Sequence, residues 1–229
     1  MTYFTGDFHG DVWSLNDRFA DIKLKEEDIV IILGDAGLNY YDNKKDKERK
    51  RILNTNGIEY LCVHGNHEMR PSTIESYHEE KWHNGIVYVE DEHRNLKFAK
   101  DGEIYELDGM RYIVIGGAYS VDKYYRLANK YKWFSDEQPD ETIKNRVEDV
   151  LEKEDWKIDY VLSHTCPSKY VPVEAFLPGL DQKMIDHSTE EWLDTIEDRL
   201  SYSKWLCGHW HINKKINNIE FIYNNIITN

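Results

Sequence analysis

Five short blocks of residue types that bind metal ions occur in order along the chain. Together they supply two Asp, one Asn and five His, which are oxygen and imidazole ligands suited to divalent cations. Two such cations held about 3.5–4 Å apart clamp the attacking and leaving oxygens of an in-line displacement at phosphorus. The residue types therefore predict a two-metal site for phosphate-ester hydrolysis. The blocks are Gly6-Asp7-Phe8-His9-Gly10, Gly34-Asp35, Gly65-Asn66-His67-Glu68, Ser163-His164 and Gly208-His209-Trp210-His211.

The first and last blocks place ligands two residues apart. Asp7 and His9 directly follow an expected strand, where side chains at this spacing can point toward one place. Glycines on either side of this pair allow the backbone to approach that place closely. His209 and His211 repeat the spacing near the other end of the chain. We therefore expect these four side chains to converge.

The two middle blocks supply different oxygen ligands. Asp35 follows an apolar run, and its two carboxylate oxygens could bridge two cations. Asn66 offers a neutral amide oxygen, which completes a ligand shell without adding charge.

Each block alone is weak evidence, because Gly-Asp pairs are common in turns and an isolated Ser-His is usually a surface or core feature. The ordered set has no such explanation, since a buried cluster of carboxylates and imidazoles without a cation would carry a large desolvation cost. The remaining histidines lack similar neighbours, and we expect them to be structural or exposed. They are His64, His78, His83, His93 and His187.

Strand and helix patterns alternate in the first third of the chain, which indicates parallel strands with crossover helices and a site at the strands' carboxyl ends. Asp11 is the expected N-cap of the first helix. The expected strands are Tyr3–Thr5, Ile29–Leu33 and Ile58–Val63, and the expected helices are Val12–Ala20 and Asp42–Leu53.

Short strands separated by Gly and Asp turns follow, and Asp108-Gly109 is a hairpin signal. We expect a long functional loop with some helix over Ala118–Pro139, and a loop after His164 that contains Pro167, Pro172 and Pro178. The overall pattern predicts two packed sheets with helices outside. The expected strands are Ile86–Val89, Leu96–Phe98, Glu103–Leu107, Arg111–Ile115, Asp159–Leu162, Trp205–Cys207, Ile212–Ile216 and Glu220–Ile227, and the expected helices are Thr142–Lys153 and Glu190–Leu200.

The composition limits the classes of partner. The net charge is -14, with 43 acidic and 29 basic residues, so an extended nucleic-acid-binding face is not expected, although a local basic patch is compatible with this balance. Three cysteines without scaffold spacing predict reduced thiols and a cytoplasmic protein. No signal peptide is visible and no apolar run approaches the ~20 residues of a membrane span. The oligomeric state stays open.

The five blocks resemble those of the calcineurin-like metallophosphoesterases. That family carries an Asp-x-His block, a Gly-Asp block, a Gly-Asn-His-Asp/Glu block, a later His and a Gly-His-x-His block, and this chain matches each of them over nearly its whole length. The resemblance implies a four-layer α/β/β/α sandwich, in which two mixed sheets are flanked by helices. The blocks span Asp7 to His211, so a division into two domains would split the site, and we expect a single domain over residues 1–229.

The resemblance also implies a role for each residue of the site. His67 would be the general acid, Glu68 would orient His67 or its loop, and Asp35 would bridge the two metals, which share the attacking hydroxide. We expect two Mn2+ ions, with Fe, Zn or Ni as alternatives. The implied ligands are Asp7, His9, Asp35 and His211 for the first metal, and Asp35, Asn66, His164 and His209 for the second.

The chain departs from the protein-phosphatase branch of that family. There a Val-Asp-Arg-Gly motif supplies an Arg that binds substrate phosphate, whereas here Ala36-Gly37-Leu38-Asn39 follows the second block. The stretch Gly116-Gly117-Ala118-Tyr119-Ser120-Val121-Asp122 resembles a small bacterial and phage-type subgroup. Within it Arg126, together with Asn66, is the candidate for binding the substrate phosphate. The alternative is that Arg126 is only a surface residue in a charged loop.

The expected reaction is hydrolysis of phosphate mono- or diesters in a phosphorylated small molecule or nucleotide. Aromatic side chains between Tyr119 and Phe134 could stack on a base, although core or lid packing is the commoner role of such residues. A protein Ser/Thr phosphatase and a DNA or RNA nuclease are alternatives, opposed by the missing Arg motif and by the acidic charge. A non-catalytic scaffold is a further alternative, opposed by the complete ligand set.

Overall fold

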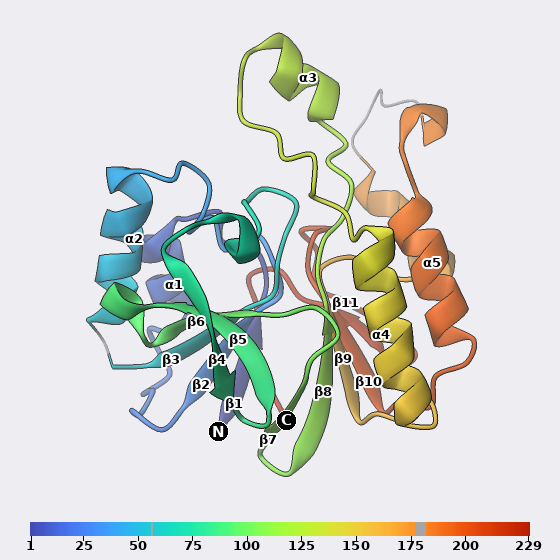
Figure 1. The fold of residues 1–229 in the computed structure, drawn as a ribbon, viewed down its shortest axis with the longest axis horizontal. Coiled ribbons are helices and arrows are strands. Elements are labelled where there is room, and N and C mark those ends of the chain that lie inside the picture. The colour runs from blue at the N-terminus through green and yellow to red at the C-terminus, as the bar shows by residue number, and fades with distance from the viewer. Residues whose placement is uncertain (56, 177–181) are drawn as a thin grey trace.

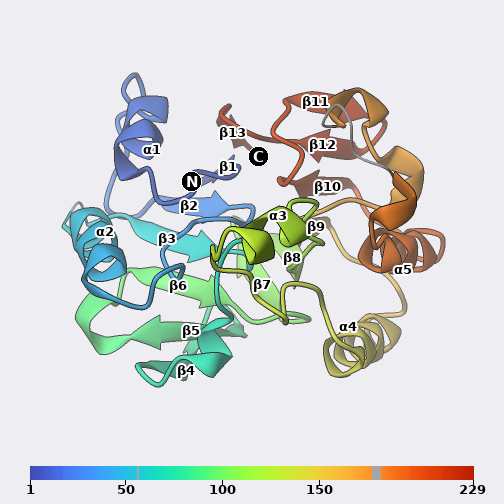
Figure 2. The same ribbon diagram turned by 90° about the horizontal axis from the view of Figure 1, so that it is seen from above.

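Two β-sheets pack face to face, and helices cover the outer face of each (Figures 1 and 2). The computed structural model describes residues 1–55, 57–176 and 182–229, so Pro178 lies outside the described residues. The arrangement confirms the expected four-layer α/β/β/α sandwich of two mixed sheets.

The first sheet has the strand order β13-β1-β2-β3-β6-β5-β4. The central strands β1, β2, β3 and β6 run parallel, and the outer strands pair antiparallel. The last residues of the first three strands lie side by side, with Thr5 opposite Ile32 and Ile32 opposite Cys62. The strands are β1 (Thr2–Thr5), β2 (Ile29–Ile32), β3 (Glu59–Cys62), β4 (Tyr77–Trp82), β5 (Gly85–Glu90), β6 (Leu96–Ala99) and β13 (Ile227–Thr228).

The second sheet has the order β11-β12-β10-β9-β8-β7. Strands β8, β9, β10 and β12 run parallel, and Ser163 at the end of β9 lies opposite both Ile115 and Cys207. Each ligand block therefore begins at a strand's last residue or within three residues after it, on one edge of a sheet. The strands are β7 (Ile104–Leu107), β8 (Met110–Ile115), β9 (Tyr160–Ser163), β10 (Lys204–Cys207), β11 (Lys214–Ile216) and β12 (Ile219–Phe221).

Helices α1 (Val12–Arg18) and α2 (Lys44–Asn54) cover the first sheet, and α4 (Glu141–Lys153) and α5 (Ser188–Glu197) cover the second (Figure 2). Helix α3 (Lys123–Ala128) projects from the end of the molecule opposite both termini (Figure 1). Asp11 caps α1 as expected, because its side chain accepts a hydrogen bond from the Ser14 amide at 3.0 Å. Short 3-10 turns occur at Pro71–Thr73, Asp91–His93, Ser168–Tyr170, Val173–Ala175 and Gln182–Met184.

Three apolar layers hold the sandwich together. Alternation along β1 sends Phe4 into the layer between the sheets and Tyr3 into the layer under α1 and α2. The third layer packs α4 and α5 on the second sheet through residues such as Val147 and Trp192. Because both faces of each sheet are covered, the central parallel strands are mostly buried and rich in apolar residues, as in IVII of β2 and YVLS of β9. Among the described residues, no helix is long and apolar enough to cross a membrane.

Two sequence expectations for strands were incomplete or wrong. Strand β4 was not predicted, because the edge sequence from Tyr77 to Trp82 is mostly charged and its side chains are largely exposed. The single strand expected over Glu220–Ile227 is wrong. Its first part lies in β12 of the second sheet, and the chain then crosses to pair β13 with β1 of the first sheet.

Candidate metal centre

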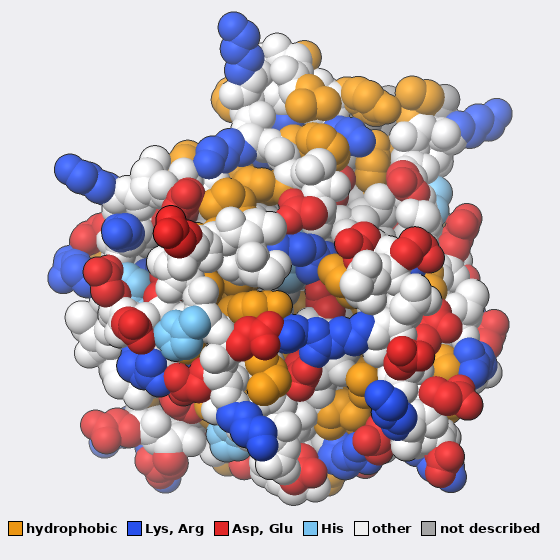
Figure 3. All heavy atoms as spheres, viewed as in Figure 1, with side chains coloured by type: hydrophobic (Ala, Val, Ile, Leu, Met, Phe, Trp, Pro, Cys, Tyr) orange, Lys and Arg blue, Asp and Glu red, His pale blue; other side chains and the backbone are white. Residues whose placement is uncertain are grey.

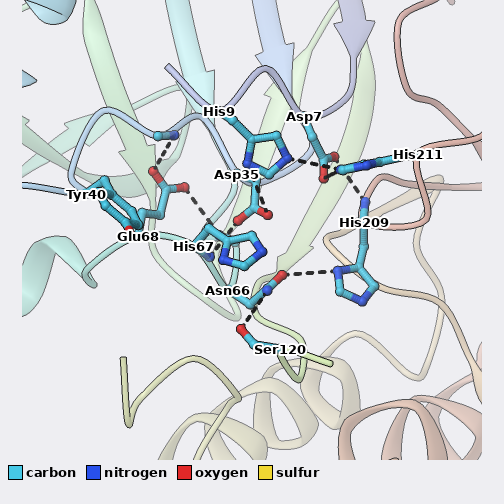
Figure 4. A network of polar contacts seen from close by, with 12 residues as sticks. Asp7, His9, Asp35, Tyr40, Asn66, His67, Glu68, Ser120, His209 and His211 are labelled. Carbon is cyan, nitrogen blue, oxygen red and sulfur yellow. Dashed lines mark hydrogen bonds and ion pairs between the residues drawn. The ribbon is translucent and has the colours of Figure 1, made fainter. Parts of the chain in front are cut away.

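All seven predicted ligands meet in one space between the edges of the two sheets. Figure 4 labels six of these ligands together with His67. Asp35 lies at the centre of the group, and the other five are Asp7, His9, Asn66, His209 and His211. Loops after β1, β2 and β3 contribute from the first sheet, and loops after β9 and β10 contribute from the second. Residues more than 200 positions apart in the sequence are therefore in contact.

The first and last blocks form one cluster. The Nε2 atoms of His9 and His211 lie 3.0 Å apart, and His211 Nε2 lies 3.3 Å from Asp7 Oδ2. One ligand atom from each of these three residues lies within 4.8 Å of the others. The ring of His211 also stacks on Tyr223, with 4.7 Å between centroids. This cluster matches three of the four ligands expected for the first metal.

A second cluster surrounds His164. Its Nε2 lies 3.6 Å from Asp35 Oδ2 and 2.9 Å from Asn66 Oδ1, and His209 Nδ1 lies 3.1 Å from the same amide oxygen. Asp35 Oδ2 is also 3.8 Å from His9 Nδ1 in the first cluster. Asp35 therefore faces both clusters, which is the position that a bridging ligand needs. Asp7 also belongs to a group with Asp35 and His164, a closeness that the sequence did not indicate.

The donor set of the second cluster fits a cation. His164 Nδ1 lies 2.8 Å from the Leu33 carbonyl oxygen, which only accepts, so Nδ1 must carry the proton. In the neutral ring the Nε2 lone pair then faces oxygen atoms of Asp35 and Asn66, and this contact is repulsive unless a proton or a metal ion lies between them. The amide nitrogen of Asn66 contacts Ser120 Oγ at 2.9 Å, which turns its oxygen toward the cluster.

The first cluster fits a cation for a second reason. Asp7 is 1% exposed, and among the described residues its Oδ2 has no hydrogen-bond partner. A buried carboxylate oxygen without a hydrogen bond is costly, and a cation bound between it and His211 would remove that cost. The residues present are therefore compatible with two divalent metal ions.

Electrostatics at the centre favour positive charge. Burial opposes the charged form of His164, yet the facing carboxylates of Asp35 and Asp7 raise its pKa to about 9. Burial also opposes ionisation of Asp35, but His164 and His67 bring its pKa well below the usual range. Burial and the nearby His164 lower the pKa of His209 to about 3. His209 is thus a neutral ring with a lone pair available, as a metal ligand must be.

The backbone is strained at four of the seven predicted ligands. His9, Asp35, His209 and His211 have φ values of 48°, 46°, 65° and 50°, in the left-handed region that non-glycine residues rarely adopt. Such strain costs about 1–3 kcal/mol for each residue and persists where the surrounding structure enforces it. Its concentration here indicates that the loops are shaped to aim these side chains.

Two glycines let the loops approach the ligands. A Cβ at Gly34, whose φ is +94°, would lie 1.9 Å from His164 Nδ1, and a Cβ at Gly65 would lie 2.1 Å from the Asp35 amide nitrogen. Neither position accommodates a side chain without displacing a predicted ligand.

Two ionisable side chains, the buried Glu68 and the half-buried Arg18, hold the loops in place. Glu68 accepts hydrogen bonds from the Gly65 amide at 3.3 Å and the Gly37 amide at 3.1 Å, and it joins the second block's loop to the third. Burial raises its pKa to about 8. Arg18 of α1 donates to the carbonyl oxygens of Gly6, at 2.9 Å, and Asp7, at 2.7 Å, on the first block. The sequence had indicated a supporting role for Glu68 but gave no signal for Arg18.

His67 and Arg126 lie at the mouth of the centre. The His67 amide donates to Asp35 Oδ1 at 2.8 Å, and its ring lies 5.5 Å from that of His9. Burial lowers the pKa of His67, and the negative charge of Asp35 opposes this shift. Arg126 Nε lies 2.8 Å from both oxygens of Asp122, and its guanidinium faces the cavity rather than bulk solvent, with the side chain 17% exposed.

A cavity of about 420 Å3 opens from the metal centre toward α5. Its walls include residues from segments far apart in the chain. Tyr119 and Val121 belong to the stretch that resembles the phage-type subgroup, and Trp210 lies inside the fifth block. Sequence reasoning gave no signal for Phe176, Ile185, Asp186 and Glu190, and it placed His187 among the structural or exposed histidines.

The other predicted non-ligand histidines lie away from the two clusters. His64 and His93 are buried, and His78 and His83 are exposed, as expected for structural or surface positions. His187 differs, since it lines the cavity.

The model of the calcineurin-like phosphoesterase family matches residues 2–213. No curated protein matches the chain. The solved structure of TT1561 of Thermus thermophilus is similar, with 15% identity, a TM-score of 0.50 and coverage of 96% of this chain and 87% of that one. The protein of unknown function AQ665 from Aquifex aeolicus shows 18% identity, a TM-score of 0.35 and coverage of 72% and 80%. The likeness to TT1561 bears on the fold alone.

Proposed function

The chain belongs to the calcineurin-like phosphoesterase family, and on this basis we propose that it is a binuclear-metal-dependent hydrolase of phosphate mono- or diesters. The observation that carries the proposal is the position of Asp35 between two clusters of ligand atoms. Both sheets contribute ligands, so we propose that residues 1–229 act as one domain. The three cysteines are buried free thiols, which supports a reducing, cytoplasmic location.

Seven residues would hold the metal ions. Asp7, His9 and His211 would bind one ion, Asn66, His164 and His209 would bind the other, and Asp35 would bind both. When bound, the pair supplies a water of lowered pKa as nucleophile and neutralises charge on the phosphoryl oxygens. The mixed nitrogen and oxygen ligands suit Mn2+, with Fe, Zn or Ni as alternatives.

His67 is the proposed general acid. It follows Asn66 at the mouth of the centre, and its amide bond to Asp35 fixes the loop that carries the ring. The ring is partly exposed and lines the cavity. A proton donated from this ring to the departing oxygen would stabilise a leaving alkoxide.

Arg126 and Asn66 are the proposed contacts to the substrate phosphate. Arg126 uses Nε for Asp122 and Nη1 for Tyr40 and the Lys132 carbonyl. Its Nη2 has no hydrogen bond within the described residues and can donate to a phosphoryl oxygen. The ion pair with Asp122 orients the guanidinium, which supports a substrate contact over the alternative of a surface residue.

The shape of the cavity favours a small substrate. Aromatic and aliphatic side chains line the side toward α5, including Phe176 and Trp210 at 6.1 Å between ring centroids. A concave, mostly apolar site with a few polar groups is typical of small-molecule pockets. We therefore propose a phosphorylated small molecule or nucleotide as substrate, in preference to a phosphoprotein or a nucleic acid.

A paired rate comparison tests the proposal. The purified protein, supplied with Mn2+, is given p-nitrophenyl phosphate and bis-p-nitrophenyl phosphate in parallel assays. Preference for the diester would assign a phosphodiesterase, and preference for the monoester would assign a phosphatase. If neither ester is hydrolysed while the protein binds metal, the proposed function is wrong and the fold serves as a scaffold.

A further inference from the structure

A second cavity joins the metal centre on the side of α2 and α3. It has a volume of about 270 Å3 and is lined by Tyr40, Tyr41 and Arg49 together with residues of the metal centre's mouth. His9, His67 and Arg126 line both cavities. We call this second cavity the tyrosine groove, and its full lining is His9, Gly37, Tyr40, Tyr41, Arg49, His67 and Arg126.

Four cationic side chains converge on the two tyrosines of this groove. Lys45 Nζ lies 2.9 Å from Tyr41 Oη and 4.3 Å from its ring centroid. On the same ring, the Arg49 guanidinium carbon lies 5.5 Å from the centroid. Lys132 Nζ donates to the Tyr41 carbonyl oxygen at 3.0 Å, and Arg126 donates to Tyr40 Oη at 3.2 Å.

This concentration of positive charge contrasts with the rest of the chain, whose net charge is -14. Helix α2 alone carries six Lys or Arg and two acidic residues. Blue Lys and Arg side chains lie over α2 and around the base of α3 on the upper left of Figure 3. The acidic groups that face the groove's cations are Asp46, 3.5 Å from Arg49, and Asp122, which pairs with Arg126. Among the described residues, ion pairs therefore join two carboxylates to two of these four cations, and Asp35 is the nearby carboxylate on the side of His9.

Hydrogen-bond donors remain available in the groove. Arg49 donates through Nη1 to the Gly37 carbonyl oxygen at 3.0 Å, and its Nε and Nη2 have no hydrogen bond within the parts of the chain that the structure describes. The same holds for Nη2 of Arg126. Both side chains are 17% exposed, so they are held in place without being sealed from a ligand. Guanidinium donors with tyrosine hydroxyls are well suited to phosphate oxygens.

We propose that the tyrosine groove is a subsite for a second phosphate group of the substrate. The inference rests on the proposed function and narrows its substrate class to small molecules that carry a further phosphate beyond the one that is hydrolysed. The scissile phosphate would lie at the metal centre, and the second would contact Arg49 with support from Lys45 and Lys132.

The groove adjoins the proposed general acid. His67, the proposed proton donor to the leaving oxygen, lines the groove as well as the main cavity. A group attached to the leaving oxygen can therefore extend past His67 toward Arg49. The cations there would strengthen binding of a substrate whose leaving group is anionic. They would have little effect on binding of a substrate whose leaving group is uncharged.

Competitive inhibition measures the subsite directly. Propyl phosphate and 1,3-propanediol bisphosphate are compared as inhibitors of whichever p-nitrophenyl ester the metal-loaded protein hydrolyses. The two compounds share a flexible chain and differ in the second phosphate. A bisphosphate with two identical ends can bind in two orientations, which alone gives an advantage of about twofold. We expect it to bind at least about tenfold more tightly than propyl phosphate, because the second phosphate gains a charge-assisted contact. A ratio near twofold in the wild type would overturn the subsite and leave the proposed function intact.

Arg49→Gln should reduce this ratio to about the twofold value. Arg51→Gln is the matched control, because Arg51 lies on the same helix, is exposed and pairs with Glu48, so it removes the same charge outside the groove. An equal fall in both variants would assign the effect to long-range charge and refute the subsite. Arg49 also packs against Gly10, so Lys132→Gln, expected to lower the ratio as well, replaces Arg49→Gln if that variant does not fold.

If the protein hydrolyses no p-nitrophenyl ester, the proposed function fails but the subsite is still testable. The two compounds are then compared by calorimetric titration of the metal-loaded protein. A ratio that is at least about tenfold and sensitive to Arg49→Gln supports the groove as a phosphate site independently of catalysis. A ratio near twofold overturns it.

Discussion

The Nε2 atoms of His9 and His211 face each other at 3.0 Å, although the two residues are 202 positions apart in the chain. Two ring nitrogens at this distance repel each other unless a proton or a cation lies between them. Asp7 Oδ2, which has no hydrogen-bond partner among the described residues, is 3.3 Å from His211 Nε2. The same place is thus the meeting point of two lone-pair donors and a carboxylate, which is what a metal ion requires.

Metal binding should therefore stabilise the fold, and His211→Ala should weaken this effect. A ligand at about 100 times its dissociation constant stabilises a protein by about 2.7 kcal/mol, which raises the melting temperature of a chain of this size by roughly 5–10 °C. Thermal denaturation with Mn2+ and with a chelator measures the shift. We expect a clearly smaller shift in His211→Ala, while His78→Ala, which removes an exposed histidine elsewhere, behaves as wild type. Equal shifts in all three proteins would remove His211 from the ligand set.

Asp35→Asn should cost both metal ions. The carboxylate lies 3.6 Å from His164 and 3.8 Å from His9, so the loss of its charge affects both clusters. Removing a group that only orients a metal ligand lowers metal affinity or activity roughly 10–100-fold. Removing a ligand that both metal ions share should therefore lower turnover at least about a hundredfold. Metal content after gel filtration and the rate of ester hydrolysis provide the measurements. A metal-replete, active variant would contradict the bridging position.

The general position of the site followed from the sequence because three strands end in register. Thr5, Ile32 and Cys62 are neighbours at one edge, so ligands two to four residues beyond them had to meet. Apolar runs mark buried parallel strands clearly, and those runs preceded each block. The packing of two sheets against each other agreed with the predicted order of strands and helices and with the family resemblance.

Features that depend on contacts between distant segments were beyond prediction. The left-handed backbone at Asp35 and His209 contradicts local preference and is enforced by the surrounding fold. Nothing near Arg49 in the sequence indicates that α2 brings it beside Arg126. The strand pattern after Glu220 looked continuous, but the hydrogen bond from Arg18 to the Tyr223 carbonyl, at 2.8 Å, holds the chain where it leaves one sheet for the other.

Gly34→Ala should destabilise the protein far more than Gly109→Ala. Both glycines have a left-handed φ, +94° and +78°, but a Cβ at Gly34 meets His164 at 1.9 Å whereas nothing lies within 4 Å of one at Gly109. The left-handed backbone costs about 1–2 kcal/mol in each variant, and overpacking adds about 1–3 kcal/mol at Gly34 alone. Chemical denaturation measures the free energies of unfolding. Equal costs would show that His164 moves freely, against its proposed rigid position.

Glu190→Gln should change the pH dependence of stability. Glu190 is 3% exposed, and burial raises the pKa of its carboxyl, although Thr165 donates a hydrogen bond to it. Because the pKa of this carboxyl is higher in the folded than in the unfolded protein, its neutral form stabilises the fold. This stabilisation is fully present below the pKa of the unfolded protein and is lost as the pH rises through the pKa of the folded protein. Gln does not titrate, so the free energy of unfolding of wild type relative to the variant should fall as the pH rises above about 5.

Glu191→Gln, an exposed change on the same helix, is the control for Glu190→Gln and should leave the pH dependence as in wild type. Chemical denaturation at several pH values provides the comparison. If the difference between wild type and Glu190→Gln stays constant or rises with pH, the buried carboxyl is not the cause of any loss of stability above pH 5.

His67→Asn separates proton donation from metal binding. The variant keeps every proposed ligand and the backbone amide that donates to Asp35, so its metal content should equal that of wild type. A general acid contributes about 10^2–10^4-fold where a basic alkoxide leaves, and much less where p-nitrophenolate leaves, because that anion needs no proton. Rates for an alkyl and a p-nitrophenyl ester of the same type should therefore fall unequally, with the alkyl ester losing far more. An equal fall for both esters, at full metal content, would assign His67 to phosphate binding instead of proton transfer.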